Sequence, residues 1–260
     1  MEMTFRWYGS GQEDITLDQI RQIPGVRGIV GCLMDIPVGE VWPKERIRTL
    51  RDEVAAHGLS LKVIESVNVH DDIKAGLPSR DAYIENYRQT IRNLSEFGVR
   101  VICYNFMPVF DWVKSDLDYV LPDGSHTLCF KREDLPDDPD DLLARYSSGT
   151  DYALPGWEPE RLAHLRELFE LYRDVDEQAL RNNLLYFLKA IMPTCEECDV
   201  RMAIHPDDPP YTLFGLPRII KNRDDLDWLC TAVDSPMNGI TLCTGSIAEE
   251  PSNDVYAILD

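Results

Sequence analysis

A histidine and a cysteine stand at the ends of two successive apolar runs. His205 closes the run VRMAIHP (200–206), and Cys243 closes the next one, GITLCTG (239–245). Imidazole and thiolate are both good ligands for borderline divalent metals, and a catalytic metal needs one or two further ligands and open positions. The pair therefore predicts half of a metal site, with ordinary packed residues as the alternative.

The loop after His205 reads HPDDPP. Asp207 and Asp208 could accept the second imidazole proton or a substrate hydroxyl, because carboxylates are common partners of ligating histidines. Prolines 206, 209 and 210 restrict the backbone of this loop. The alternative is an Asp-Pro turn that only leads the chain out of a strand.

Polar residues also follow other apolar runs. NFMPVFDW (105–112) offers Asn105 and Asp111 among aromatic groups, which suits a sugar or sugar-acid pocket or, alternatively, a buried aromatic plug. VIESVNVHDD places Glu65 at the end of a run and His70 beyond it. Either is a candidate ligand or acid/base, and Glu65 could instead pair with a neighbouring base.

The first apolar run is FRWYG (5–9). Arg6 could hold a carboxylate bidentately, Tyr8 could hydrogen-bond a hydroxyl, and Trp7 is predicted to be core. CEEC (195–198) matches a CxxC pattern. It falls at the end of a predicted helix and has no second cysteine pair, so we assign it no metal or redox role.

Six apolar or β-branched runs, mostly continuous, predict parallel strands covered on both faces. They are 5–9, 26–33, 59–66, 99–106, 200–206 and 239–245. Helical periodicity predicts helices at about 43–57, 80–97, 159–172 and 176–198, and NDVYAILD resembles the start of another. DGSH (123–126) resembles a hairpin turn. Strand, helix and strand in alternation are typical of βαβ units.

Candidate residues at the ends of many different strands favour a parallel barrel over a doubly wound sheet, which gathers its site at one switch point. No GxGxxG or Walker motif supports a nucleotide fold. We predict one α/β barrel domain over 1–260 with a helical, acidic insertion at about 108–198. A full barrel has eight strands, so about two βα units are missing from the six found.

Acidic residues outnumber Lys and Arg by 46 to 26, a net charge of −20. Such a surface repels nucleic-acid phosphates and anionic lipid unless basic residues cluster, and no cluster occurs. No basic leader or long apolar run is found, which predicts a cytoplasmic protein without nucleic-acid or membrane partners. Seven scattered cysteines indicate reduced thiols in a reducing compartment.

Ten motifs, in order along residues 3–254, closely resemble those of the mannonate dehydratase family. They are FRWYG, RQIPGVRGIVG, VGEVWP, VIESV, RDAYIENYRQTIRNL, CYNFMPVFDW, LPGWE, IHPDDPP, FGLPRI and NGITLCTGS. The resemblance implies a TIM (β/α)8-type barrel of the xylose-isomerase-like kind. It also implies dehydration of D-mannonate to 2-dehydro-3-deoxy-D-gluconate in hexuronate (glucuronate) catabolism, with Mn2+ or Fe2+ and as a homo-oligomer.

The resemblance carries two metal ligands over to His205 and Cys243. The family's further histidine and aspartate come from two later motifs that have no counterpart here, which agrees with the two βα units missing from the strand count. We therefore expect a C-terminally truncated member, two ligands short, that folds poorly and has little activity.

The implied reaction removes the proton α to the carboxylate and expels the C3 hydroxyl. The expected substrate-binding residues are Arg6, Tyr8, Asn105 and Asp208, with Tyr8 and Asp208 also candidates for proton transfer. Two alternatives stay open. One is a metal-dependent sugar isomerase or epimerase that uses Glu65 and His205, and the other is an inactive truncated fragment.

Overall fold

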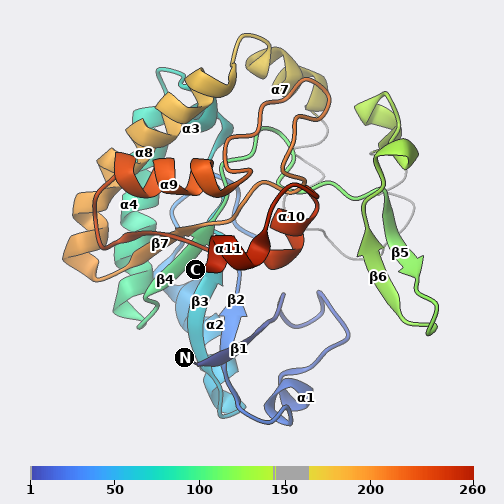
Figure 1. The fold of residues 1–260 in the computed structure, drawn as a ribbon. Helices are drawn as coiled ribbons and strands as arrows, with labels where there is room; N and C mark the ends of the chain where they lie inside the picture. The colour runs from blue at the N-terminus through green and yellow to red at the C-terminus, as the bar shows by residue number, and fades with distance from the viewer. Residues whose placement is uncertain (1, 143, 145–163) are drawn as a thin grey trace.

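Six parallel strands form the main sheet of this computed structural model, which describes residues 2–142, 144 and 164–260 (Figure 1). Their spatial order is their chain order, as in a parallel barrel, and every neighbouring pair is parallel. The strands are β1 (Met3–Arg6), β2 (Val26–Gly31), β3 (Ser60–Glu65), β4 (Val101–Tyr104), β7 (Arg201–Ile204) and β8 (Asn238–Ile240). All six predicted strands are confirmed. Within the described residues the sheet is open, with β1 and β8 at its edges.

Long helices connect the strands and lie together on one side of the sheet (Figure 1). They are α2 (Lys44–Ala56), α4 (Arg80–Glu96), α8 (Glu177–Cys198) and α9 (Arg223–Ala232). In α2 the buried side chains are Ile47, Leu50 and Val54, at the predicted helical spacing. Gly58 follows the helix with φ of +73°, a left-handed conformation in which glycine carries no steric penalty.

Shorter helices complete the connections: α1 (Leu17–Arg21), α3 (Asp71–Ala75), α7 (Leu165–Tyr172), α10 (Thr244–Ala248), α11 (Val255–Leu259) and the 3-10 turn η1 (Arg132–Asp134). The predicted helix at 159–172 is confirmed from Leu165 onward, and residues 159–163 lie outside the described part. The helix predicted within NDVYAILD is α11. None of the described helices is long and apolar enough to cross a membrane.

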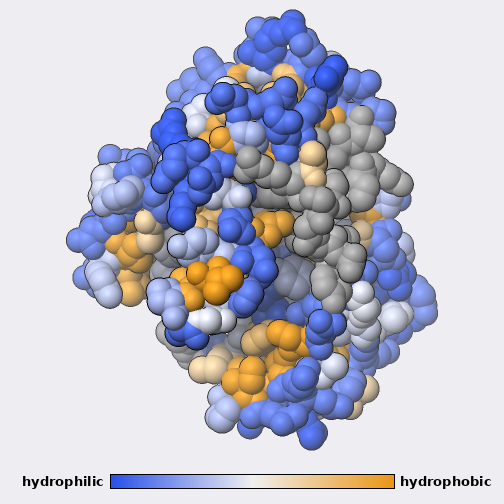
Figure 2. Space-filling view, turned by 90° about the vertical axis from the view of Figure 1, so that its right-hand side faces the viewer, coloured by the Kyte–Doolittle hydropathy of each residue, from blue (hydrophilic) through white to orange (hydrophobic). Residues whose placement is uncertain are grey.

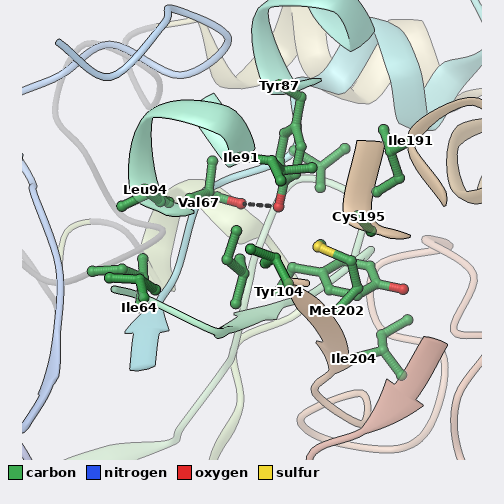
Figure 3. Packing of buried hydrophobic residues seen from close by; sticks show 14 of the residues in the cluster. Ile64, Val67, Tyr87, Ile91, Leu94, Tyr104, Ile191, Cys195, Met202 and Ile204 are labelled. Atoms are coloured by element: carbon green, nitrogen blue, oxygen red, sulfur yellow. Dashed lines mark hydrogen bonds between the residues drawn. The ribbon is translucent and has the colours of Figure 1, made fainter. Parts of the chain in front are cut away.

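The core lies between the sheet and the long helices (Figure 3). Phe187 of α8 has no exposed surface and meets the rings of Tyr87 and Tyr104 edge-on, with centroids 5.0 and 6.0 Å away. The buried hydroxyl of Tyr87 donates to the Val67 carbonyl at 3.2 Å. This hydrogen bond lets a tyrosine occupy an apolar layer without leaving its polar atom unsatisfied.

A two-stranded antiparallel hairpin, β5 (Asp116–Val120) and β6 (His126–Cys129), lies apart from the main sheet at the right of Figure 1. Its turn contains DGSH, which confirms the hairpin predicted there. The face on this side of the molecule is mainly hydrophilic, with separate hydrophobic patches (Figure 2). An acidic chain of charge −20 is expected to show such a surface.

Candidate active site

A cavity of about 600 Å3 opens where the strands of the main sheet end at their carboxyl termini. Its wall is formed by Arg6, Tyr8, Gln12, Glu13, Glu65, Ser66, Cys103, Tyr104, Asn105, Met107, Asp111, Trp112, Lys114, Leu128, His205, Asp208 and Cys243. The sequence had predicted Arg6, Tyr8, Asn105, His205, Asp208 and Cys243 as site residues. The structure brings all six to this one cavity.

His205 and Cys243 are brought together by the pairing of β7 with β8, in which Ile204 lies beside Ile240. The Nδ1 atom of His205 lies 2.7 Å from the Pro206 carbonyl oxygen. Because a carbonyl only accepts, Nδ1 carries a proton and the Nε2 atom is the one that can act as a metal ligand.

Each residue of this pair shifts the pKa of the other. Burial disfavours the charged form of His205, but the hydrogen bond and charge of Cys243 outweigh it and raise the imidazole pKa to about 9. Burial alone would raise the pKa of Cys243, but His205 and then Ser246 lower it to about 7. A thiol that ionises this readily is suited to metal binding, which requires the thiolate.

The donor pair fits a borderline divalent cation by its chemistry and by its fixed imidazole tautomer. Within the described residues, no group of three or more His, Cys, Asp or Glu side chains is arranged to hold a metal. His205 and Cys243 would therefore supply two ligands.

The two aspartates of the loop have different roles. Asp207 is 2% exposed, and one of its oxygens accepts from the backbone N–H groups of Ile219 and Ile220 at 2.6 and 2.7 Å. The expectation that Asp207 accepts an imidazole proton or a substrate hydroxyl is wrong, because buried N–H groups of a neighbouring segment require its oxygen. The Pro206 carbonyl takes the imidazole proton instead.

Asp208 faces the cavity and is held from two sides. One carboxylate oxygen accepts from Lys114 Nζ at 2.5 Å, and the other accepts from the Ser246 hydroxyl at 3.0 Å. The same hydroxyl lies 3.2 Å from the sulfur of Cys243. Asp208 therefore has a fixed orientation, and Ser246 connects it to the candidate metal ligand.

Lys114 and Glu249 were not predicted from the sequence. The ammonium of Lys114 contacts both Asp208 and Glu249, and the attraction of these carboxylates outweighs the effect of burial and raises the lysine pKa. Lys114 is the second residue after the NFMPVFDW motif. Its position in a loop that follows a strand was the only feature of the sequence that could have indicated a role in the site.

At the ends of β1 and β3, Arg6 and Glu65 lie 3.7 Å apart, which confirms the alternative that Glu65 pairs with a neighbouring base. Arg6 also donates to the carbonyls of Trp7 and Val30 and stacks over the Tyr8 ring at 4.4 Å. These contacts involve the Nε and Nη1 atoms of Arg6, so a bidentate grip on a substrate carboxylate would compete with them. Burial raises the pKa of Tyr8, which keeps its phenol protonated.

Asn105 and Asp111 both line the cavity, while the neighbouring aromatic residues Phe106 and Phe110 are 1% and 0% exposed. The aromatic part of the motif is therefore a buried plug, whereas its two polar residues line the cavity, and their contact with a sugar acid stays a prediction. His70 is not among the described residues that line the cavity. Its ring stacks on Tyr83 at 3.6 Å and caps α3, so its predicted role as ligand or acid/base is wrong.

In the CEEC motif, Cys195 has no exposed surface and Cys198 is the last residue of α8. Burial raises the pKa of Cys195 to about 12. This shift is opposite to the one that makes a thiol reactive.

Parallel strands in barrel order, with the imidazole, the thiol and several charged groups at their carboxyl ends, define an α/β-barrel enzyme. A sequence model described as D-mannonate dehydratase (UxuA) matches residues 1–260. The chain belongs to the mannonate dehydratase family.

Individual relatives agree with this assignment. The chain is 64% identical to a mannonate dehydratase of Lactococcus lactis subsp. cremoris over its whole length, which spans 73% of that protein. It is 58% identical to one of Thermotoga neapolitana, with 98% of the chain and 71% of the relative covered. The crystal structure of the mannonate dehydratase from Streptococcus suis serotype 2 superposes with a TM-score of 0.86 at 48% identity, covering 99% of this chain and 68% of that one.

Proposed function

We propose that the cavity binds D-mannonate and that the protein dehydrates it to 2-dehydro-3-deoxy-D-gluconate, in hexuronate (glucuronate) catabolism in the cytoplasm. The observation that carries the proposal is the gathering of six predicted residues in one cavity, in a chain of the mannonate dehydratase family. A volume of about 600 Å3 is ample for a six-carbon sugar acid.

We propose His205 and Cys243 as ligands of Mn2+ or Fe2+. A divalent cation there would supply positive charge that stabilises the enolate formed when the α proton leaves. The protein's own part is to fix the imidazole through the Pro206 carbonyl and to keep the Cys243 thiol readily ionised beside His205. The first feature orients the imidazole towards the metal and the second supplies a thiolate, while the imidazolium proton must leave when the metal binds.

The substrate contacts proposed are Arg6, Tyr8, Asn105 and Asp208, which line the cavity on different sides. The protonated phenol of Tyr8 can donate a hydrogen bond to a substrate oxygen, and the Asp208 carboxylate can accept one from a hydroxyl. Tyr8 and Asp208 are also the candidates for proton transfer, because both present a proton-carrying or proton-accepting group to the cavity. The family resemblance also supports a homo-oligomer.

The direct test is an assay for 2-keto-3-deoxy acid with D-mannonate and Mn2+, using a thiobarbiturate colour reaction. Slow formation of this product is expected, because His205 and Cys243 supply two of the metal ligands, and it should fall to background in Cys243→Ser, which replaces a thiolate ligand with a hydroxyl. Matched Cys230→Ser changes an exposed thiol on α9 and should retain full activity. An isomerised sugar acid without keto-deoxy acid would contradict the proposal, as would the absence of any product.

A further inference from the structure

Three charged side chains from distant segments meet at one side of the cavity. Lys114 comes from the loop after β4, Asp208 from the loop after β7, and Glu249 follows α10. Their side chains are 10, 14 and 19% exposed, and the ammonium of Lys114 contacts both carboxylates. We call these three residues the Lys114 cluster. It holds two negative charges and one positive charge when all three groups are ionised.

The substrate of the proposed function is an anion, and four of the six Asp, Glu, Lys and Arg side chains in the cavity wall are acidic. Glu13, Glu65, Asp111 and Asp208 line it, whereas the described lysine and arginine residues in the wall are Arg6 and Lys114. A carboxylate that enters such a wall needs a cationic partner, since it loses hydration there.

Arg6 is engaged by Glu65 and by two backbone carbonyls, as described above. Within the cluster, Lys114 contacts two carboxylates, and a proton can neutralise one of them. Replacing one carboxylate by another at an ammonium preserves a charge-assisted hydrogen bond. Lys114 is therefore the cation better placed to exchange a protein carboxylate for that of the substrate.

Of the two carboxylates that contact Lys114, that of Glu249 is better suited to give up its contact. Its Oε2 atom is buried and has no hydrogen-bond partner within the described part of the chain. Asp208, in contrast, has hydrogen bonds to both of its oxygens. A buried carboxylate oxygen without a partner is costly when charged, and a proton removes that cost.

The surroundings of Glu249 favour protonation. Burial and the negative charge of Asp208 outweigh the attraction of Lys114 and raise the pKa of Glu249 to about 7. Tyr211 also faces this group, with Arg132 over its ring, and Glu250 is next in the chain. Near neutral pH, the Lys114 cluster can therefore gain one proton at little cost.

We propose that Lys114 receives the carboxylate of the sugar acid, and that Glu249, displaced by it, takes up one proton from solvent. This inference rests on the proposed function and adds the residue that recognises the acid group. The net charge of the site is conserved, because the negative charge brought by the substrate replaces the one that Glu249 loses. Only this proton moves, and no covalent bond in the substrate changes.

Proton uptake on binding can be counted by titration calorimetry of D-mannonate into the Mn2+-saturated protein in buffers with different enthalpies of ionisation. At pH 8, above the pKa of Glu249, uptake should approach one proton, and at pH 6, where Glu249 is mostly protonated beforehand, it should fall towards zero. Glu249→Gln should lose this uptake. Matched Glu250→Gln, which changes the next residue in the chain, a carboxylate bound to Ser252, should retain it.

The affinity of Lys114 variants tests the other half of the inference. Lys114→Gln should weaken D-mannonate binding by about 10- to 100-fold, the loss expected for a charge-assisted hydrogen bond. Lys114→Arg keeps the charge and should recover part of that loss. Circular dichroism melting shows whether each variant is folded. If Lys114→Gln is unfolded, the proton uptake of Glu249→Gln tests the inference instead.

The outcomes separate the two proposals. Binding of D-mannonate without proton uptake, or equal uptake by the unaltered protein and Glu249→Gln, would overturn the role of the Lys114 cluster and leave the proposed function standing. Failure of the unaltered protein to bind D-mannonate would overturn both.

Discussion

At the scale of single residues, the main feature of the site is the mutual effect of His205 and Cys243. Each stabilises the charged form of the other, so that the imidazole pKa rises to about 9 while the thiol pKa falls to about 7. Between these two values the pair is predominantly thiolate and imidazolium in the metal-free protein. Metal binding must then release the imidazolium proton, which makes the affinity for metal rise with pH.

The lowered pKa predicts selective alkylation of Cys243 in the metal-free protein. At pH 7 about half of this thiol is ionised, whereas an ordinary thiol with a pKa of about 8.5 is only a few per cent ionised. Iodoacetamide should therefore modify Cys243 about tenfold faster than Cys230, whose side chain is exposed and whose pKa is raised by partial desolvation and by the negative charge of Asp227. Peptide mass spectrometry at a series of pH values measures both rates in one sample.

His205→Gln removes the group that lowers this pKa. The pH at which Cys243 reaches half of its maximal alkylation rate should then move up towards 8.5, with Cys230 unchanged. If the two thiols titrate alike in the unaltered protein, or if His205→Gln leaves the profile of Cys243 in place, the interaction described here is incorrect.

The residues that could be predicted are those at the ends of apolar runs. Parallel strands bring their carboxyl ends to one edge, so His205 and Cys243 could be paired from sequence order alone. Lys114 and Glu249 could not, since Lys114 lies in an irregular loop and Glu249 follows the short helix α10, and the course of both segments depends on tertiary contacts. The sequence also could not show that Asp207 is buried while Asp208 faces the cavity. That difference depends on the backbone N–H groups of Ile219 and Ile220, which bind Asp207.

At the scale of elements, strand and helix periodicity located the main sheet and the long helices α2, α4 and α8, whereas α9 (Arg223–Ala232) was not predicted. Their boundaries were less predictable: in place of the run 239–245 the structure has a strand of only three residues, Asn238–Ile240, and the chain enters α10 soon after it. This early end places Cys243 directly before a helix and beside Ser246. The helices are required for the site because they cover the strands that carry it.

The central helix α8 offers a direct test of this dependence. Phe187 is fully buried against Tyr87, Tyr104 and Phe106, whereas adjacent Tyr186 is 41% exposed. Phe187→Ala should lower the free energy of unfolding by about 3–5 kcal/mol through lost burial and a cavity. Tyr186→Ala should cost less than about 1 kcal/mol. Urea unfolding followed by circular dichroism measures both, and equal losses would contradict the described core.

At the scale of the whole molecule, the chain has the six parallel strands of a barrel-type sheet and spans 73% of the length of its Lactococcus lactis relative. The family match extends over the entire chain, so the arrangement of strands and the fold class were accessible from motifs and periodicity together. The charge of −20 was also evident, but its consequence depends on how the charges are distributed. Figure 2 shows that hydrophilic residues cover much of one face of the molecule.

This charge predicts that salt stabilises the protein. Exposed ion pairs such as Lys44 with Glu96 and Arg48 with Glu45 are each worth about 0–1 kcal/mol and are weakened by salt. Repulsion among the excess carboxylates acts over longer distances and is screened first, as the Debye length falls from about 30 Å at 0.01 M to about 8 Å at 0.15 M ionic strength. Because a charge of −20 makes repulsion dominant, adding NaCl over this range should stabilise the fold by about 1 kcal/mol.

In thermal unfolding at pH 8, that stabilisation corresponds to a rise of about 2–4 °C in Tm for a chain of this size. KCl at the same ionic strength should have the same effect, since screening depends on ion concentration and valence and not on which monovalent cation is present. The rise should level off above about 0.15 M, where little long-range repulsion is left to screen. A Tm that falls with salt would contradict this prediction. It would mean that salt weakens the attraction within local ion pairs, among them the Lys114 cluster, more than it weakens the repulsion among the excess carboxylates.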